Sequence, residues 1–220
     1  MPVSAEMAAG LAATLRATGR RQRFRRGHAL FVEGDHAERV LVLEHGRVLI
    51  SIVAPNGREV VLGICGPGEL LGEMSALDGE PRSATATAID EVEVTVAPVS
   101  VLLAALERPD AAREVIRTLA ARLRDGDRRR LEFAALGTLG RVAWRIMELT
   151  ERFGERDGDD TAIDVPLSQE QLASWCGSSW EATVKALAQL RKLGIVTTGR
   201  QRIVIRDLAA LHKLADGVAQ

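Results

Sequence analysis

The 220-residue chain has few cysteines and no long apolar run. Its two cysteines, Cys65 and Cys176, are too few for a disulfide framework or a four-cysteine metal site, which favours a reducing compartment. The longest apolar runs, such as residues 40–43, fall far short of the roughly 20 residues that cross a bilayer. The N-terminus also lacks the apolar segment of a secretion signal. We therefore expect a cytoplasmic protein with no membrane partner.

Charge is distributed unevenly along the chain. Residues 1–109 carry 11 basic and 14 acidic side chains, whereas residues 168–206 carry six basic and two acidic ones, within a chain of formal net charge -1. A basic C-terminal segment favours a surface that binds a polyanion such as nucleic acid. The alternative is a solvated surface that is basic without further function.

Short apolar segments separated by glycine and asparagine turns fill the first hundred residues, after a helix-like pattern at 4–18 and an arginine cluster at 20–26. This spacing predicts an antiparallel barrel or jelly roll rather than a parallel sheet. The expected strands are Ala29–Val32, Arg39–Glu44, Arg47–Ala54, Glu59–Cys65, Ser83–Ala88 and Glu91–Pro98.

A long helix is expected after the barrel, because the composition changes to alanine, leucine, arginine and glutamate. Its apolar residues Ile116, Leu119 and Leu123 recur at intervals of three and four, which predicts packing on a partner helix in a dimer. The same spacing then reaches Gly126 or Asp127 and, after it, Arg130, which suit a dry interface poorly. Either these residues face solvent, or a ligand or an inter-subunit polar network interrupts the apolar contact.

The C-terminal segment carries a helix-turn-helix pattern. Ser168 and Gln171 have the spacing of a capping box, Gly177 supplies a turn, and Ser178 or Ser179 begins a second helix that ends near Lys192. A strand-turn-strand with basic residues at its tip follows, which is typical of a winged helix-turn-helix. In a helix-turn-helix the second helix enters the major groove of DNA. Packing positions on that helix are expected to include Ala182, Val184, Leu187 and Leu190. The candidate DNA-binding residues are Gln169, Ser178, Ser179, Trp180, Glu181, Thr183, Lys185, Arg200 and Arg202. The alternative is a helix pair that only packs.

Residues 68–84 combine glycines, a short helix and the sequence Pro81-Arg82-Ser83. A glycine turn and helix amides form an anion site, where Arg82 can meet a phosphate bidentately and Ser83 adds a hydroxyl. The segment resembles the phosphate-binding cassette of the cyclic AMP receptor protein/FNR superfamily, and the order of barrel, long helix and winged helix-turn-helix resembles it over nearly the whole chain. The resemblance implies that Gly72, Glu73, Arg82 and Ser83 hold the ribose and cyclic phosphate. The alternative is an Arg82–Glu73 salt bridge in an empty barrel.

Two departures from the superfamily concern specificity. Related cyclic AMP-binding members place a Thr-Ser or Thr-Asn pair on the long helix, where this chain has Gly126-Asp127. Cyclic AMP is favoured as effector, with cyclic GMP or another nucleotide left open through Asp127 and Arg130. The second helix begins Ser179-Trp180-Glu181 rather than with the usual Ser-Arg-Glu, so we expect a different operator or weaker operator binding.

The sequence thus predicts an α+β fold with an N-terminal antiparallel β jelly roll that binds a cyclic nucleotide (1–109), a long dimerisation helix (110–137) and a C-terminal winged helix-turn-helix (138–220). The expected function is a homodimeric, cyclic-nucleotide-responsive transcription regulator without a metal or prosthetic group. Its expected partners are a near-palindromic double-stranded DNA operator and RNA polymerase. One alternative is a constitutive DNA-binding dimer with an architectural barrel. The other, a cupin-like enzyme, is disfavoured because the four histidines form no His-x-His cluster.

Overall fold

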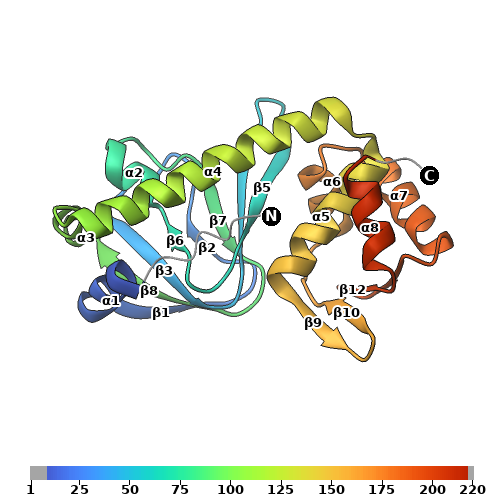
Figure 1. Cartoon of the computed structure of the whole chain (residues 1–220). Coiled ribbons are helices and arrows are strands. Elements are labelled where there is room, and N and C mark those ends of the chain that lie inside the picture. The colour runs from blue at the N-terminus through green and yellow to red at the C-terminus, as the bar shows by residue number, and fades with distance from the viewer. Residues whose placement is uncertain (1–8, 218–220) are drawn as a thin grey trace. The chain divides into compact units, whose positions relative to one another are not determined.

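The structure is a computed structural model that describes residues 9–217, and these divide into two compact units between Asp125 and Gly126 (Figure 1). The N-terminal unit contains α1 (Ala9–Thr18), β1 (Arg20–Phe24), β2 (Ala29–Phe31), β3 (Arg39–His45), β4 (Val48–Val53), β5 (Glu59–Cys65), β6 (Leu70–Leu71), α2 (Glu73–Asp78), β7 (Thr85–Ala88), β8 (Val92–Pro98), α3 (Val99–Leu106) and most of α4 (Pro109–Ala135). The C-terminal unit continues with α5 (Thr138–Phe153), β9 (Gly154–Asp157), β10 (Asp160–Ile163), α6 (Gln169–Trp175), α7 (Trp180–Lys192), β11 (Val196–Gly199), β12 (Arg202–Ile205) and α8 (Leu208–Ala215). The expected α+β fold class is confirmed; the expected domain boundaries stay a prediction, and residues 4–8 of the expected first helix lie outside the described part.

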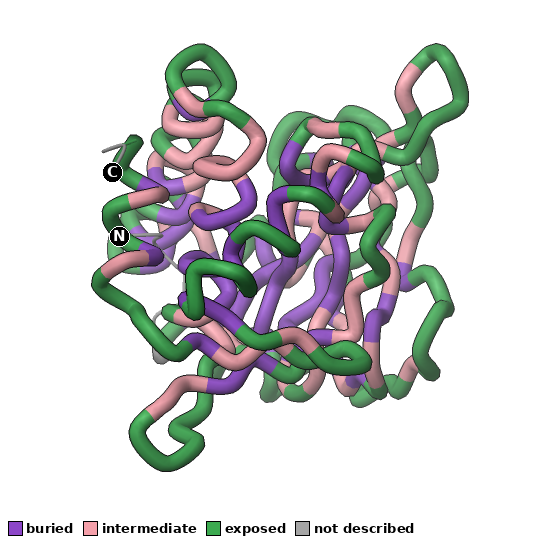
Figure 2. The backbone as a smooth tube through the Cα atoms, turned by 90° about the vertical axis from the view of Figure 1, so that its right-hand side faces the viewer, coloured by how far each residue is buried: buried purple, intermediate pink, exposed green. Residues whose placement is uncertain are grey.

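Two four-stranded antiparallel sheets build the N-terminal unit, in the orders β1-β8-β3-β6 and β2-β7-β4-β5. Strand β3 explains why residues 40–43 are apolar without alternation. Leu41 and Leu43 pack into the core between the sheets, and Val40 and Val42 pack under α1, α3 and the first turns of α4. Because both faces of β3 are covered, residues 40–43 are all buried. Figure 2 draws the buried stretches of the chain in purple.

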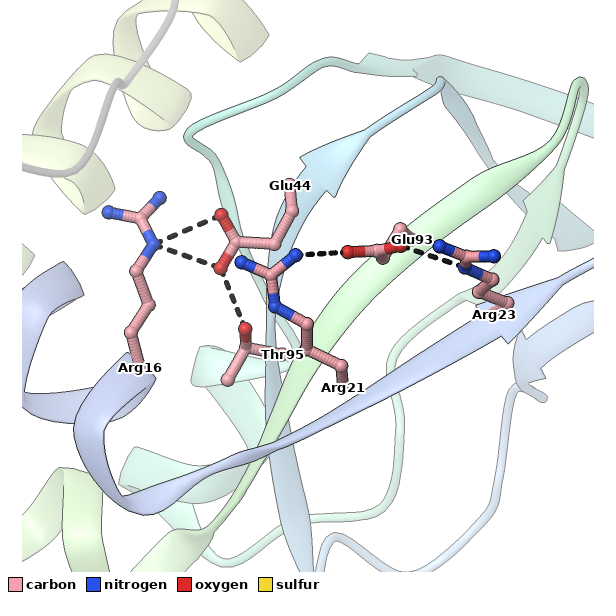
Figure 3. Close-up of polar contacts among 6 residues, drawn as sticks. All are labelled: Arg16, Arg21, Arg23, Glu44, Glu93 and Thr95. Atoms are coloured by element: carbon pink, nitrogen blue, oxygen red, sulfur yellow. Dashed lines mark hydrogen bonds and ion pairs between the residues drawn. The ribbon is translucent and has the colours of Figure 1, made fainter.

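The arginine cluster at 20–26 contains a strand that the sequence pattern did not predict. Strand β1 lies at the edge of its sheet, where charged side chains discourage pairing with another chain. Arg21 and Arg23 both pair with Glu93 of the neighbouring β8, the second at 2.8 Å between Nε and Oε2. Figure 3 shows these polar contacts and those that fasten α1 to the same sheet, made by Arg16, Arg21, Arg23, Glu44, Glu93 and Thr95.

The C-terminal unit joins its helices to a four-stranded sheet in the order β11-β12-β10-β9. Residues 154–160 are acidic and contain glycine, and they form most of the β9–β10 hairpin around Gly158. The composition is that of a loop, but β10 pairs with β12, which lies some forty residues further along the chain. Local composition cannot report that pairing. Among residues 9–217, no helix has both the length and the apolar character to cross a bilayer.

Candidate functional site

The cassette is built around Gly72, which joins β6 to α2 in a left-handed conformation with φ 79°. A Cβ at this position would lie 2.3 Å from Nη1 of Arg82, so the backbone approaches the guanidinium as closely as a residue without a side chain allows. The Gly72 carbonyl oxygen accepts a hydrogen bond from the same nitrogen at 2.7 Å. Glycine is therefore required here both for the turn and for the contact.

Arg82 lies deep in the cassette with 3% of its surface exposed. Its two terminal nitrogens donate to the carbonyl oxygens of Gly72 and Arg39, and its guanidinium carbon lies 4.5 Å from the centroid of the Phe31 ring. Its Nε has no hydrogen-bond partner, and burial lowers the pKa of Arg82. Ser83 follows with its side chain in an exposed position. Arg82 thus lies in the predicted cassette with one donor atom left over, and its role toward a phosphate stays a prediction.

Glu73 is fully buried at the start of α2 and pairs with Arg122 of α4. The expected alternative, a salt bridge between Glu73 and Arg82, is wrong: Arg82 is held by backbone carbonyls, while the carboxylate lies against the long helix. Burial, which outweighs the charge of Arg122, raises the pKa of Glu73. Its second oxygen, Oε2, has no hydrogen-bond partner. The cassette therefore holds one unsatisfied acceptor and one unsatisfied donor, on Glu73 and Arg82.

Sequence reasoning missed Arg122, although a signal for it exists. Ala111, Val115 and Thr118 form the buried face of α4, and four residues further along that face comes an arginine. A cation on a buried helix face needs a carboxylate or carbonyl partner. Arg122 finds both, since Nη2 also donates to the Leu70 carbonyl oxygen at 2.9 Å. It connects α4 directly to the cassette.

Asp127 and Arg130 pair with each other on α4, with 2.8 Å between Oδ1 and Nη1, and both side chains are largely exposed. They belong to the C-terminal unit, so their expected role toward a nucleotide stays a prediction.

The helix-turn-helix is present as expected, formed by α6 and α7. Ser168 accepts from the Gln171 amide at 3.0 Å, and the Gln171 side chain accepts from the Ser168 amide, which completes the capping box. Ser179, rather than Ser178, caps α7 by accepting from Ala182 at 3.2 Å. The Ser178 hydroxyl instead bonds to Thr138 at 2.9 Å.

The outer surface of this motif carries most of the predicted DNA-binding side chains. Those that are exposed are Gln169, Ser179, Trp180, Glu181, Lys185, Arg200 and Arg202, and Ser178 is half-buried. Thr183 was predicted to lie on this exposed face. The prediction is wrong, because Thr183 is fully buried. The buried residues of α7 are Thr183, Ala186, Leu187 and Leu190. The last three follow Thr183 by three, four and seven positions, so they lie on one face of the helix. Ala182 and Val184, which were expected to pack, lie beside that face and are only half-buried.

The wing is the β11–β12 hairpin, whose two-residue tip is Arg200-Gln201. Arg202 directly follows the tip, as the first residue of β12, and pairs with Asp157 at 2.8 Å and with Asp164 at 3.7 Å. Its charge is thus partly neutralised by neighbouring acidic residues. Among residues 9–217 no hydrogen bond or ion pair engages Arg200, which leaves its cation available at the tip.

Three buried ionic side chains lie next to helix α6 of the helix-turn-helix. Arg145 of α5 is 2% exposed and pairs with Glu132 at the end of α4 and with Glu148 one turn further along α5. Its guanidinium carbon also lies 5.4 Å from the centroid of the Trp175 ring on α6. Burial, opposed by Arg145, raises the pKa of Glu132. One cation therefore connects three helices of the C-terminal unit.

Comparison with known proteins agrees with both units. Residues 21–109 match the cyclic nucleotide-binding domain and residues 140–214 match the Crp-like helix-turn-helix domain. A CRP-like cAMP-activated global transcriptional regulator of Mycobacterium tuberculosis is 34% identical over 193 residues, 87% of this chain and 86% of the relative. A cyclic AMP receptor protein of Thermus thermophilus is 31% identical over 203 residues, 90% and 89% of the two chains.

Solved structures show the same fold. FixK2 from Bradyrhizobium japonicum superposes with a TM-score of 0.79 at 25% identity, covering 90% of this chain and 97% of its own. A CRP-family transcriptional regulator from Thermus thermophilus gives 0.76 at 28% identity, covering 90% and 98%. The Mycobacterium tuberculosis relative and the CRP-family structure from Thermus thermophilus are named as transcriptional regulators, which overturns the cupin-like enzyme alternative. The chain belongs to the cyclic AMP receptor protein/FNR family of DNA-binding transcription regulators and carries the family's cyclic nucleotide-binding domain and Crp-like helix-turn-helix.

Proposed function

We propose that this protein is a homodimer whose affinity for its DNA operator is set by a cyclic nucleotide bound in the cassette. The observation that carries the proposal is the pair of unsatisfied buried atoms, Glu73 Oε2 and Arg82 Nε, beside the left-handed Gly72. A buried polar atom without a partner costs roughly 1–3 kcal/mol, more when the group is charged. A ligand that supplies both a hydroxyl and an anionic oxygen offsets that cost.

A ribose cyclic phosphate has this chemistry. Its phosphate oxygens accept from Arg82 and from the exposed Ser83 hydroxyl, and its ribose hydroxyl donates to Glu73. Since Glu73 also pairs with Arg122, the ligand changes the charge and hydration around a residue of α4. The nucleotide and the long helix are thereby coupled through one carboxylate.

The dimer is supported by the outer face of α4. Ile116 and Leu123 are large apolar residues, and they are 63% and 65% exposed. They lie outside the face of α4 that packs against the barrel. Leu119, expected in the same contact, is half-buried and packs against the unit's own core. A second copy of α4 that covers Ile116 and Leu123 removes apolar surface from water.

The proposal includes an effector, a DNA operator and RNA polymerase. Cyclic AMP is the proposed effector, because the Mycobacterium tuberculosis and Thermus thermophilus relatives are named for it. The operator is a near-palindromic duplex, since a two-fold dimer presents two copies of α7 to successive major grooves. RNA polymerase is the proposed partner through which the bound dimer changes transcription, and Asp127 and Arg130 are proposed to contact the nucleotide base.

Calorimetric titration of nucleotide-free protein with cyclic AMP, cyclic GMP and cyclic di-GMP tests the proposal. We expect saturable binding of cyclic AMP that Arg82→Lys weakens and Arg82→Ala removes, because both lose the bidentate fork. Arg58→Ala is the matched control, since Arg58 is an exposed arginine on the β4–β5 turn. Binding that is unchanged in Arg82→Ala, or absent with all three nucleotides, contradicts the proposal.

A second candidate function is ligand-independent DNA binding. It is favoured by the partners that the cassette already has, since Arg82 donates to two carbonyls and Glu73 pairs with Arg122. In that case the ion pair is architectural, and operator affinity is the same with and without any nucleotide. Measuring operator binding in both conditions separates the two candidates.

A further inference from the structure

The recognition helix α7 begins with a large exposed apolar side chain. Trp180 is its first residue and 47% of its surface is exposed, whereas Trp175, on α6, is 3% exposed. Helical side chains lean toward the N-terminus, so the indole extends over the end of α7 that enters the major groove. Trp180 therefore presents a large apolar surface to solvent at the start of α7.

The rest of the exposed first two turns limits what this end of α7 can recognise. Glu181 and Lys185 are exposed and one turn apart, and between them lie the half-buried Ala182 and Val184. Lys185 is the only cation in these two turns of the helix. An arginine fork that could bind guanine O6 and N7 is missing from the position of Trp180.

From this geometry we infer that Trp180 is a specificity-determining residue that contacts the 5-methyl group of thymine in each half-site. Thymine is the one base that presents an apolar group in the major groove, and apolar side chains recognise it by contact. Covering a methyl group with the indole removes apolar surface of both from water. The inference rests on the DNA-binding part of the proposed function and adds the base that this residue reads.

The test begins by selecting bound duplexes from a random-sequence DNA pool with full-length protein, with and without cyclic AMP. Each thymine of the selected site is then replaced by uracil, which removes only the methyl group. We expect one thymine per half-site whose replacement weakens binding about four-fold, the effect of one buried methyl group. In Trp180→Ala that replacement has no effect, in Trp180→Phe the effect remains, and Trp180→Arg selects guanine at that position.

Leu208→Ala is the matched control, because Leu208 is a 49% exposed apolar residue at the start of α8. A uracil effect of equal size in wild type and Trp180→Ala overturns the inference, since another residue then reads the methyl group. A selected site in which no thymine is sensitive to replacement by uracil also overturns the inference. Equal weakening of binding to all duplexes in Trp180→Phe overturns it too, because that result indicates a phosphate contact by the indole N–H. Selection of no duplex in either condition contradicts DNA binding itself, and the inference with it.

Discussion

At the scale of single residues, the cassette depends on a backbone conformation that glycine adopts without strain. Gly72 and Gly79 flank α2 with nearly the same left-handed φ, 79° and 76°. They differ in surroundings, because a Cβ at Gly72 would meet Arg82 at 2.3 Å and one at Gly79 would meet nothing within 4 Å. Comparing substitutions at these two glycines therefore separates the cost of the left-handed backbone from the cost of the contact with Arg82.

Substituting alanine at each glycine should therefore have unequal effects. Gly79→Ala is expected to lower the free energy of unfolding by about 1–2 kcal/mol, the cost of a left-handed L-residue. Gly72→Ala adds a further roughly 1–3 kcal/mol of overpacking and also weakens cyclic AMP binding, because Arg82 must move. Chemical denaturation and calorimetric titration measure both. Equal losses in the two variants would show that the contact with Arg82 is soft.

The buried carboxylate of Glu73 makes stability depend on pH. Its pKa is raised in the folded chain, so above the ordinary value of 4.5 the native state binds more protons than the unfolded state. The free energy of unfolding contributed by Glu73 therefore falls as pH rises from 4.5 toward the folded pKa. Denaturation of nucleotide-free protein across this range should show that fall in wild type, and a smaller one in Glu73→Gln. Parallel pH profiles would contradict the assignment.

At the scale of elements, two ion-pair environments of the C-terminal unit can be compared. Arg145 connects α4, α5 and α6 while nearly fully buried, whereas Arg202 joins β12 to the β9–β10 hairpin with 43% of its side chain exposed. Removing one member of a buried group leaves an uncompensated charge, and removing an exposed one does not.

Arg145→Met should thus destabilise the C-terminal unit by roughly 3–5 kcal/mol, because Glu132 and Glu148 lose their shared cation. Arg202→Met should cost about 0–1 kcal/mol. Thermal denaturation monitored by tryptophan fluorescence reports the difference, since Trp175 lies beside Arg145. A small effect of Arg145→Met would mean that Arg129, 3.9 Å from Glu148, already neutralises the site.

The outer face of α4 gives a prediction about assembly. Charges placed at Ile116 and Leu123 are incompatible with a dry helix contact, so the Ile116→Glu/Leu123→Glu double variant should sediment as a monomer at concentrations where wild type is a dimer. Leu103→Glu, on α3 and similarly exposed at 46%, should leave the dimer intact. A dimeric double variant in analytical ultracentrifugation would place the interface elsewhere.

At the scale of the whole molecule, much of the architecture was predictable because it is encoded locally. Glycine turns marked the barrel strands, and the Ser168–Gln171 spacing marked the start of α6. What escaped prediction depends on contacts distant in sequence: β10 is recognisable only beside β12, and Arg122 only opposite Glu73. Thr183 was assigned to the exposed face because it is polar, but the phase of α7, set by Ala186, Leu187 and Leu190, buries it.

The central claim is that a nucleotide in the cassette changes operator affinity. The most direct test is fluorescence anisotropy of a labelled, selected operator duplex titrated with wild-type protein in the absence and presence of saturating cyclic AMP. The account predicts a change in operator affinity of about 5- to 150-fold, the usual range of allosteric coupling, and none in Arg82→Ala. Equal operator affinity in both conditions, with cyclic AMP bound, would contradict it.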